Sequence, residues 1–135
     1  MMSQGELSVA SPVVIVVDDD PAVRNALRFS LEVEGFAVRD YPGGIELLND
    51  RELPAGSCLV IDHYMPGMNG LDVVGELRQR NVGVPAILIT SHPNAALARR
   101  AATAGVPIVE KPLLGDALID RIRHMLSTTD SGRAN

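Results

Sequence analysis

The stretch Cys58-Leu-Val-Ile-Asp-His-Tyr-Met-Pro-Gly-Met-Asn-Gly70 decides the fold, because a short apolar run ends there directly on a carboxylate. The run from Leu59 to Ile61 predicts a strand that is buried on both faces of a sheet. Asp62 is the first residue after this run, and it is followed by the turn formers Pro66, Gly67, Asn69 and Gly70. A carboxylate in this position lies at the edge of a parallel sheet, where such sheets bind their ligands.

Further apolar runs on both sides of this stretch also predict strands, and helical patterns separate them. The predicted strands cover residues 13–17, 36–41, 59–61, 86–89 and 106–110. The predicted helices cover residues 21–34, 45–48, 71–80, 94–104 and 118–126. This alternation indicates an α/β fold with a doubly wound, five-stranded parallel sheet that is flanked by five helices.

The composition is that of one ordinary globular domain. Of the 135 residues, 46% are hydrophobic and 21% are charged, which argues against a largely disordered chain. We expect the domain to cover residues 12–126, after a flexible N-terminal tail at 1–11. Residues 127–135 are polar and are interpreted as a C-terminal tail or the start of a linker.

Charge and cysteine content exclude several classes of function. The net charge of −5 and the lack of a basic stripe argue against direct nucleic-acid binding by this chain. Cys58 is the only cysteine, so intrachain disulfides and cysteine metal sites are excluded, and a reducing cytoplasm is the expected location. The apolar run at 13–17 is too short to span a membrane and has no basic segment before it.

Chemically active side chains stand at or just beyond the ends of the predicted strands, and in a parallel sheet these positions share one edge. They are Asp18, Asp19 and Asp20 at the first strand, Asp62 at the third, Thr90 and Ser91 at the fourth, and Lys111 at the fifth. Clustered carboxylates repel one another unless a cation joins them, and their oxygens favour a hard ion such as Mg²⁺. Asp62 is then a candidate nucleophile for phosphoryl chemistry, with Lys111 neutralising the transferred group.

Lys111 carries more information than a single basic residue usually does. Of the twelve basic residues, it is the only lysine, and the other eleven are arginines. A compact ammonium can approach a phosphoryl oxygen as a point charge, which a planar guanidinium does less well. The lysine at this strand end therefore supports the phosphoryl interpretation.

Several motifs together resemble the receiver domain of bacterial two-component response regulators. They are Val16-Val17-Asp18-Asp19, Asp62-His63-Tyr64-Met65-Pro66 with Gly70, Ile89-Thr90, and Lys111-Pro112. The resemblance covers residues 12–126 and implies a flavodoxin-like topology. It also implies that Asp62 is the phosphoacceptor, and that the donor is a phosphohistidine of a sensor histidine kinase or of a histidine phosphotransfer protein.

The resemblance assigns the other site residues as well. It implies that Asp18, Asp19, Asp62 and the backbone carbonyl of Tyr64 hold Mg²⁺, for which Mn²⁺ is a substitute. Thr90 then binds the phosphoryl group and Lys111 pairs with it. The expected protein is a signalling switch that catalyses its own phosphorylation and dephosphorylation and is not a metabolic enzyme.

The expected output is protein contact with a downstream protein or an output domain. The resemblance implies a partner surface on the alanine-rich helix at 94–104 and on the last helix, and a phosphorylation-dependent dimer is part of this expectation. Ordinary packing of these two helices against the sheet is the alternative interpretation of the same residues.

Two features depart from or add to the family pattern. Ile108 stands where an aromatic residue usually relays the signal, and Leu113 stands where phenylalanine is common, so the aromatic form of relay is in question. His92 lies two residues beyond Thr90, and Tyr64 lies two beyond Asp62. We interpret this pair as a modulator of the access of water to the phosphoryl group.

Two other functions are weighed against this one. A haloacid-dehalogenase-like phosphatase with Asp18 as nucleophile would use Asp18-Asp19-Asp20 and Ile89-Thr90, but it would leave Asp62 without a role. A degenerate receiver that acts only as a binding module is the other.

Each polar residue also has a plainer interpretation when it is taken alone. Asp20 caps a helix, Asp62 forms a turn, Thr90 caps the following helix, and Lys111 is a surface cation. His63 and His124 are expected to be surface or partly buried side chains.

Overall fold

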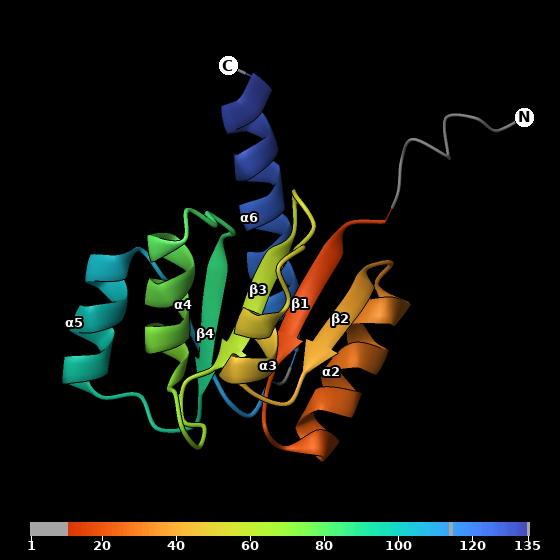
Figure 1. Ribbon diagram of the computed structural model, residues 1–135. Coiled ribbons are helices and arrows are strands. Elements are labelled where there is room, and N and C mark those ends of the chain that lie inside the picture. The colour runs from red at the N-terminus through yellow and green to blue at the C-terminus, as the bar shows by residue number, and fades with distance from the viewer. Residues whose placement is uncertain (1–10, 114, 135) are drawn as a thin grey trace, which may run out of the picture.

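One parallel sheet of five strands forms the centre of the molecule in a computed structural model of the chain (Figure 1). The structure describes residues 11–113 and 115–134. The strands are β1 (Val13–Val17), β2 (Ala37–Tyr41), β3 (Cys58–Asp62), β4 (Ala86–Thr90) and β5 (Ile108–Glu110). Their order in the sheet is β2-β1-β3-β4-β5, which is the flavodoxin-like order and confirms the predicted fold class.

Five helices connect and cover the strands, as predicted. They are α2 (Pro21–Val33), α3 (Gly44–Asn49), α4 (Gly70–Gln79), α5 (Ala95–Ala104) and α6 (Ala117–Ala134). Apolar residues of α2 and α6 join Val14 and Val16 in a core on one face of the sheet. Those of α3, α4 and α5 join Ile15 and Val17 in a core on the other face (Figure 1). Successive β1 residues thus point to opposite faces, as in any strand that is buried on both sides.

The helix boundaries follow the capping residues that the sequence contains. Asp20 is the N-cap of α2, because its Oδ1 accepts a hydrogen bond of 2.9 Å from the backbone N–H of Ala22. Gly105 ends α5 with φ +71°, a left-handed conformation that favours glycine.

Cys58 is fully buried, as expected of a small apolar residue at the start of a strand.

The last helix is longer than the sequence analysis predicts. The predicted helix ends at Leu126, whereas α6 continues to Ala134. The interpretation of residues 127–135 as a C-terminal tail or the start of a linker stays a prediction. The segment after Leu126 has no proline, and its first glycine is Gly132. Serine and threonine lower helix propensity only slightly, and an established helix gains one hydrogen bond per added residue.

Residues 1–10 of the predicted N-terminal tail lie outside the described residues, so the tail stays a prediction. Among the described helices, none combines the length and the apolar content that crossing a membrane requires.

Candidate functional site

Three carboxylates meet at the carboxyl edge of the sheet. Asp18 and Asp19 follow the last residue of β1, and Asp62 is the last residue of β3, which lies directly beside β1 in parallel register. One oxygen from each of the three side chains lies within 4.8 Å of the others. Asp18 is fully buried and Asp62 is 6% exposed, so two of the three charges are removed from water.

Lys111 brings one positive charge to this cluster. Its Nζ lies 3.0 Å from Asp18 Oδ2 and 3.5 Å from Asp62 Oδ1. The backbone N–H of Lys111 donates to the carbonyl of Thr90 at 2.8 Å, so the pairing of β5 with β4 positions the lysine. Burial alone would lower the pKa of Lys111, but its bond to Asp18 and the charge of Asp62 outweigh burial and raise it.

The ionised form of Asp62 is destabilised by its surroundings in the cluster. Burial and, after it, the charge of Asp18 raise its pKa to about 6, because the positive charge of Lys111 only partly offsets them. One ammonium facing three carboxylates leaves an excess of negative charge. All three donors are oxygens at one site, which suits a hard divalent cation such as Mg²⁺.

Asp18 is held in place by protein groups on both carboxylate oxygens. Oδ1 accepts a hydrogen bond of 3.0 Å from the backbone N–H of Asp20, and Oδ2 accepts one from Lys111. Asp62 has only the longer contact to Lys111 among the side-chain contacts of the described residues. Of these two buried acids, Asp62 therefore has the carboxylate with fewer hydrogen-bond partners.

Gly70 allows the loop after β3 to close tightly on the end of the strand. A Cβ atom at Gly70 would lie 2.6 Å from the backbone oxygen of Asp62 and 2.8 Å from Leu88 Cδ1. The backbone N–H of Gly70 donates to the carbonyl of His63 at 2.9 Å. Met65 in the same loop is buried in the core on the α3, α4 and α5 face. Glycine at position 70 is thus required by a close approach and not by its φ angle.

Thr90 is the last residue of β4 and is fully buried. Its Oγ1 accepts a hydrogen bond of 3.1 Å from the backbone N–H of His92. Thr90 is not the cap of α5, because Asn94 fills that role by accepting from the N–H of Leu97. No hydrogen bond among the described residues has the Thr90 hydroxyl as its donor, so its proton can be offered to another acceptor. The role expected for the backbone carbonyl of Tyr64 stays a prediction.

Tyr64 and His92 connect the loops that follow β3 and β4. The hydroxyl of Tyr64 donates to the backbone oxygen of His92 at 3.3 Å, and it accepts from Asn94 Nδ2 at 3.4 Å. The two rings lie edge-on at 6.4 Å between centroids. Both side chains are exposed, so they lie at the surface of the site. The modulator roles of Tyr64 and His92 are supported by this contact and stay predictions.

The other residues singled out from the sequence lie in varied surroundings. His63 is buried, so the surface or partly buried position expected for it was wrong, and burial followed by the charge of Arg100 lowers its pKa. His124 is exposed, as expected. Ile108 is partly buried and packs against the core on the α3, α4 and α5 face. The effect of Ile108 on signal relay stays a prediction.

Arg24 was not among the predicted site residues, yet its Nη1 donates to the backbone carbonyl of Asp18 at 2.8 Å. No motif marks this residue, and its apolar neighbours define the helical pattern there. Its place in the first turn of α2, directly after the acids, is the one signal that could have indicated it.

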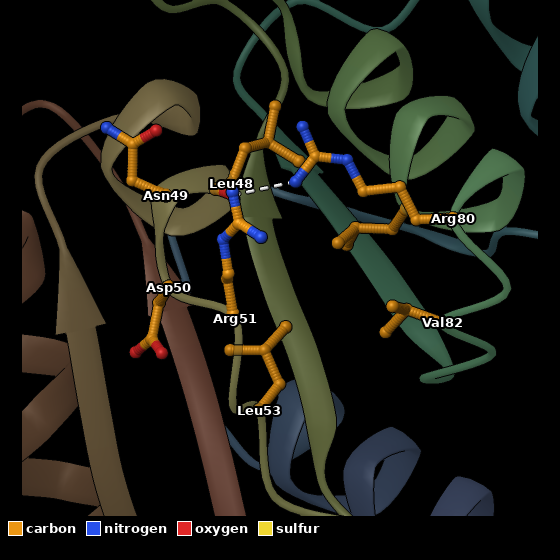
Figure 2. A pocket seen from close by; sticks show the side chains of 8 residues that line it. Leu48, Asn49, Asp50, Arg51, Leu53, Arg80 and Val82 are labelled. Carbon is orange, nitrogen blue, oxygen red and sulfur yellow. Dashed lines mark hydrogen bonds between the residues drawn. The ribbon is translucent and has the colours of Figure 1, made fainter.

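A separate hollow of about 630 Å³ lies between the C-terminal ends of α3 and α4 (Figure 2). Arg80 reaches across it and donates from Nη1 to the carbonyl of Leu48 at 2.7 Å (Figure 2). The same guanidinium bonds to Glu76 through Nε at 3.1 Å. Arg80 thus satisfies a carbonyl that the end of α3 leaves unpaired. None of the residues that line this hollow belongs to the acid cluster, so the candidate site stays at the carboxyl edge.

Comparison with known proteins gives consistent matches. The family model of the response regulator receiver domain matches residues 14–123. The transcriptional regulatory protein FixJ of Azorhizobium caulinodans is 37% identical over 123 residues, which are 89% of this chain and 58% of FixJ. The C4-dicarboxylate transport transcriptional regulatory protein DctD of Pseudomonas aeruginosa is 35% identical over 120 residues, which are 84% of this chain and 25% of DctD.

A solved structure agrees with these relatives. The response regulator StyR matches with a TM-score of 0.83 and 36% identity, covering 93% of this chain and 64% of StyR. The chain thus spans a quarter of DctD and less than two thirds of FixJ and StyR. Receiver domains of the matched family are phosphorylated on an aspartate and use Mg²⁺ as a general feature. With the family model matching most of its length and the sheet order of that fold, this chain belongs to the response regulator receiver domains of two-component systems.

Proposed function

We propose that Asp62 accepts a phosphoryl group from a phosphohistidine of a sensor histidine kinase or a histidine phosphotransfer protein. The observation that carries this proposal is the surroundings of Asp62, a nearly buried carboxylate with two further acids and one lysine around it. Such an excess of negative charge is costly unless a cation binds there, and groups perturbed in this way are typical of functional sites. The phosphatase alternative with Asp18 as nucleophile is set aside, because the chain belongs to the receiver family.

The transfer exchanges one bond to phosphorus for another. The bond between phosphorus and the donor's imidazole nitrogen breaks, a bond to a carboxylate oxygen of Asp62 forms, and the imidazole takes up a proton. Asp62 must be ionised to attack, and with a pKa of about 6 it is mostly ionised above neutral pH. Bound Mg²⁺, or Mn²⁺ in its place, supplies positive charge that lowers the repulsion between the carboxylate and the incoming phosphoryl oxygens.

The residues around Asp62 have separate roles in this proposal. Asp18, Asp19 and Asp62 hold the metal together with the backbone carbonyl of Tyr64. Lys111 Nζ, 3.5 Å from Asp62 Oδ1, offers a charge-assisted hydrogen bond to the transferred group. The free proton of the Thr90 hydroxyl is available to a phosphoryl oxygen.

We further propose that the phosphorylated protein changes conformation, signals through contact with a downstream protein or an output domain, and then dephosphorylates itself. A partner surface on α5 and α6 and a phosphorylation-dependent dimer belong to the same proposal. The net charge of −5 supports output through protein contact and not through nucleic acid. A cytoplasmic location is also proposed, because a single cysteine fits a reducing compartment.

The test is to locate the phosphoryl group directly. The protein is incubated with acetyl phosphate and Mg²⁺, and the labelled residue is identified by mass spectrometry. We expect one phosphoryl group, on Asp62, which is lost in Asp62→Asn and in the presence of EDTA. Asp72→Asn, a change at an exposed carboxylate on α4, should label normally. A label on Asp18, or no label with Mg²⁺ present, would overturn the proposal.

A further inference from the structure

Arg24 contacts the acid cluster from outside the sheet. Its Nη1 donates to the backbone carbonyl of Asp18 at 2.8 Å, and its side chain is only 20% exposed. The backbone N–H of Arg24 also donates to the carbonyl of Asp20 at 2.9 Å, in the first turn of α2. The guanidinium is thus fixed to the same short turn that supplies the two acids Asp18 and Asp19.

A second anchor for Arg24 lies on the neighbouring strand. Arg24 Nε lies 3.7 Å from Asp40 Oδ2 in β2, and Arg28 Nη1 binds the other oxygen of Asp40 at 3.0 Å. β2 and β1 pair in parallel, with Val16 opposite Asp40. Arg24 therefore spans the end of β1 and the edge strand, whereas Arg28 pairs, among the described residues, only with Asp40 and its helical neighbour Glu32.

The peptide groups of Asp18 are held on both sides. Its N–H donates to the carbonyl of Tyr41 at 3.3 Å, and its carbonyl accepts from Arg24. Because the peptide bond is planar, a fixed carbonyl at Asp18 also fixes the plane from which the backbone of Asp19 starts. We infer that Arg24 is a positioning residue that keeps Asp18 and Asp19 in the arrangement that binds a divalent cation. This inference rests on the proposed function.

If Arg24 acted through its charge alone, its removal would change the Mg²⁺ affinity in the opposite direction from that expected of a positioning residue. A guanidinium beside the acids repels Mg²⁺, so a purely electrostatic Arg24 would weaken metal binding and its removal would tighten it. A positioning Arg24 strengthens binding, so its removal weakens it, as is usual when outer partners of metal ligands are lost. The sign of the change in affinity therefore separates the two roles.

The test compares Arg24→Met with Arg28→Met by Mg²⁺ titration in a calorimeter. Methionine keeps an apolar stem and removes the guanidinium, and both arginines pair with Asp40. We expect Arg24→Met to raise the Mg²⁺ dissociation constant about tenfold, the lower end for outer partners of metal ligands, and Arg28→Met to change it less than about twofold. Arg24→Lys, which keeps a donor for the Asp18 carbonyl, should recover part of the affinity.

A second measurement does not depend on the metal. The N–H of Asp20 donates to Asp18 Oδ1 at 3.0 Å, so its hydrogen exchange in metal-free protein reports the order of the turn. We expect exchange at Asp20 to accelerate in Arg24→Met and to stay unchanged in Arg28→Met. If Arg24→Met does not fold, the comparison is made between Arg24→Lys and Arg28→Lys.

The outcomes separate this inference from the proposed function. If the parent protein binds no Mg²⁺ or is not labelled on Asp62, the proposed function fails. The other case is a parent protein that binds Mg²⁺ and is labelled on Asp62. If the Arg24 variant then binds Mg²⁺ as tightly as its Arg28 counterpart or more tightly, Arg24 is not a positioning residue.

Discussion

Asp62 and Asp50 are two carboxylates with opposite surroundings. Asp50, in the segment after α3, accepts hydrogen bonds from the Tyr41 hydroxyl at 2.5 Å and from the N–H of Glu52 at 3.1 Å. The bond from Tyr41, then that from Glu52, lowers its pKa below the ordinary value. Asp62 lies in the acid cluster, where burial and the charge of Asp18 raise its pKa to about 6.

The difference separates a carboxylate that stabilises the fold from one that is arranged for chemistry. Each donor at Asp50 favours the ionised form, so the charge contributes to stability. At Asp62, burial and the charge of Asp18 outweigh the one lysine, so the charged form is disfavoured until a cation binds. Groups with pKa values shifted by burial and like charges are typical of functional sites. Four experiments test this contrast, in order of decreasing expected effect.

The largest effect is expected from Gly70→Ala, which disturbs the loop that closes on Asp62. The added Cβ would lie 2.6 Å from the backbone oxygen of Asp62 and 3.0 Å from the Cα of His63. Backbone atoms cannot yield as a flexible side chain does, so we expect a loss of about 3 kcal/mol in the free energy of unfolding, measured with urea.

Gly75 offers a matched control on the same helix. Apart from the backbone of its own helix and its chain neighbours, no atom lies within 4 Å of a Cβ built at Gly75. Gly75→Ala should therefore raise the unfolding free energy by about 0.5–1 kcal/mol, because alanine loses less backbone entropy in a helix. Equal effects of the two substitutions would show that the close approach at Gly70 has no energetic consequence.

Asp62→Asn should stabilise the metal-free protein at pH 8. The folded pKa of about 6 lies above the ordinary value of 3.8, so between these values the folded state binds more protons than the unfolded state. The stability of the parent protein therefore falls as the pH rises from about 4 to about 6. Asparagine carries no charge at any pH, so the variant avoids this loss, and we expect a gain of about 1–3 kcal/mol at pH 8.

The gain should disappear near pH 4, where Asp62 is protonated in the folded parent. Saturating Mg²⁺ should also reduce it, because the metal stabilises the parent through the carboxylate that the variant lacks. Urea unfolding at several pH values, with EDTA or with Mg²⁺, measures both effects. A variant less stable than the parent at pH 8 in EDTA would contradict the view that the cluster carries an uncompensated charge.

Asp50→Asn should act with the opposite sign. The folded pKa of Asp50 is lowered, so its charge stabilises the protein above its ordinary pKa of 3.8, and this stability is lost as the pH falls through the folded value. We expect the variant to be less stable than the parent at pH 8 and to approach it in acid. Thermal unfolding across pH checks this, and a stabilised variant at pH 8 would remove the contrast.

The sequence was sufficient to predict the convergence of Asp18, Asp19, Asp62 and Lys111. Each follows or ends an apolar strand, and parallel strands bring their carboxyl ends to one edge whatever their order. The prediction therefore needed only the strand boundaries, which the apolar runs define well. The fold class could be predicted for the same reason.

Contacts across elements could not be predicted in this way. Arg24 reaches the carbonyl of Asp18, and Tyr64 reaches the backbone of His92, through long side chains whose direction depends on packing. Periodicity reports which face of a helix is buried but not what a polar side chain on its margin touches. The predicted end of the last helix was wrong for a different reason. Polar composition after residue 126 does not by itself end a helix, and α6 continues through these residues to Ala134.

The smallest effect is expected from His92→Ala, which tests whether the surface of the site controls the lifetime of the phosphorylated state. The Tyr64 hydroxyl bonds to the His92 backbone oxygen, and the two rings lie edge-on. Removal of the imidazole opens one side of this contact to water. We expect the lifetime of the aspartyl phosphate, followed by loss of the label with time, to fall about threefold, a small change in barrier.

His124→Ala is the control, because His124 is exposed on α6 and takes part in none of the hydrogen bonds or ring contacts that the described residues form around Tyr64 and His92. Tyr64→Phe keeps the ring and removes only the hydroxyl that joins the two loops, so its effect should be smaller than that of His92→Ala. If the tyrosine variant matches His92→Ala, the link between the loops is the important feature and not the imidazole itself. Equal lifetimes in the parent and His92→Ala would remove His92 from the account, since water would then reach Asp62 regardless of this surface.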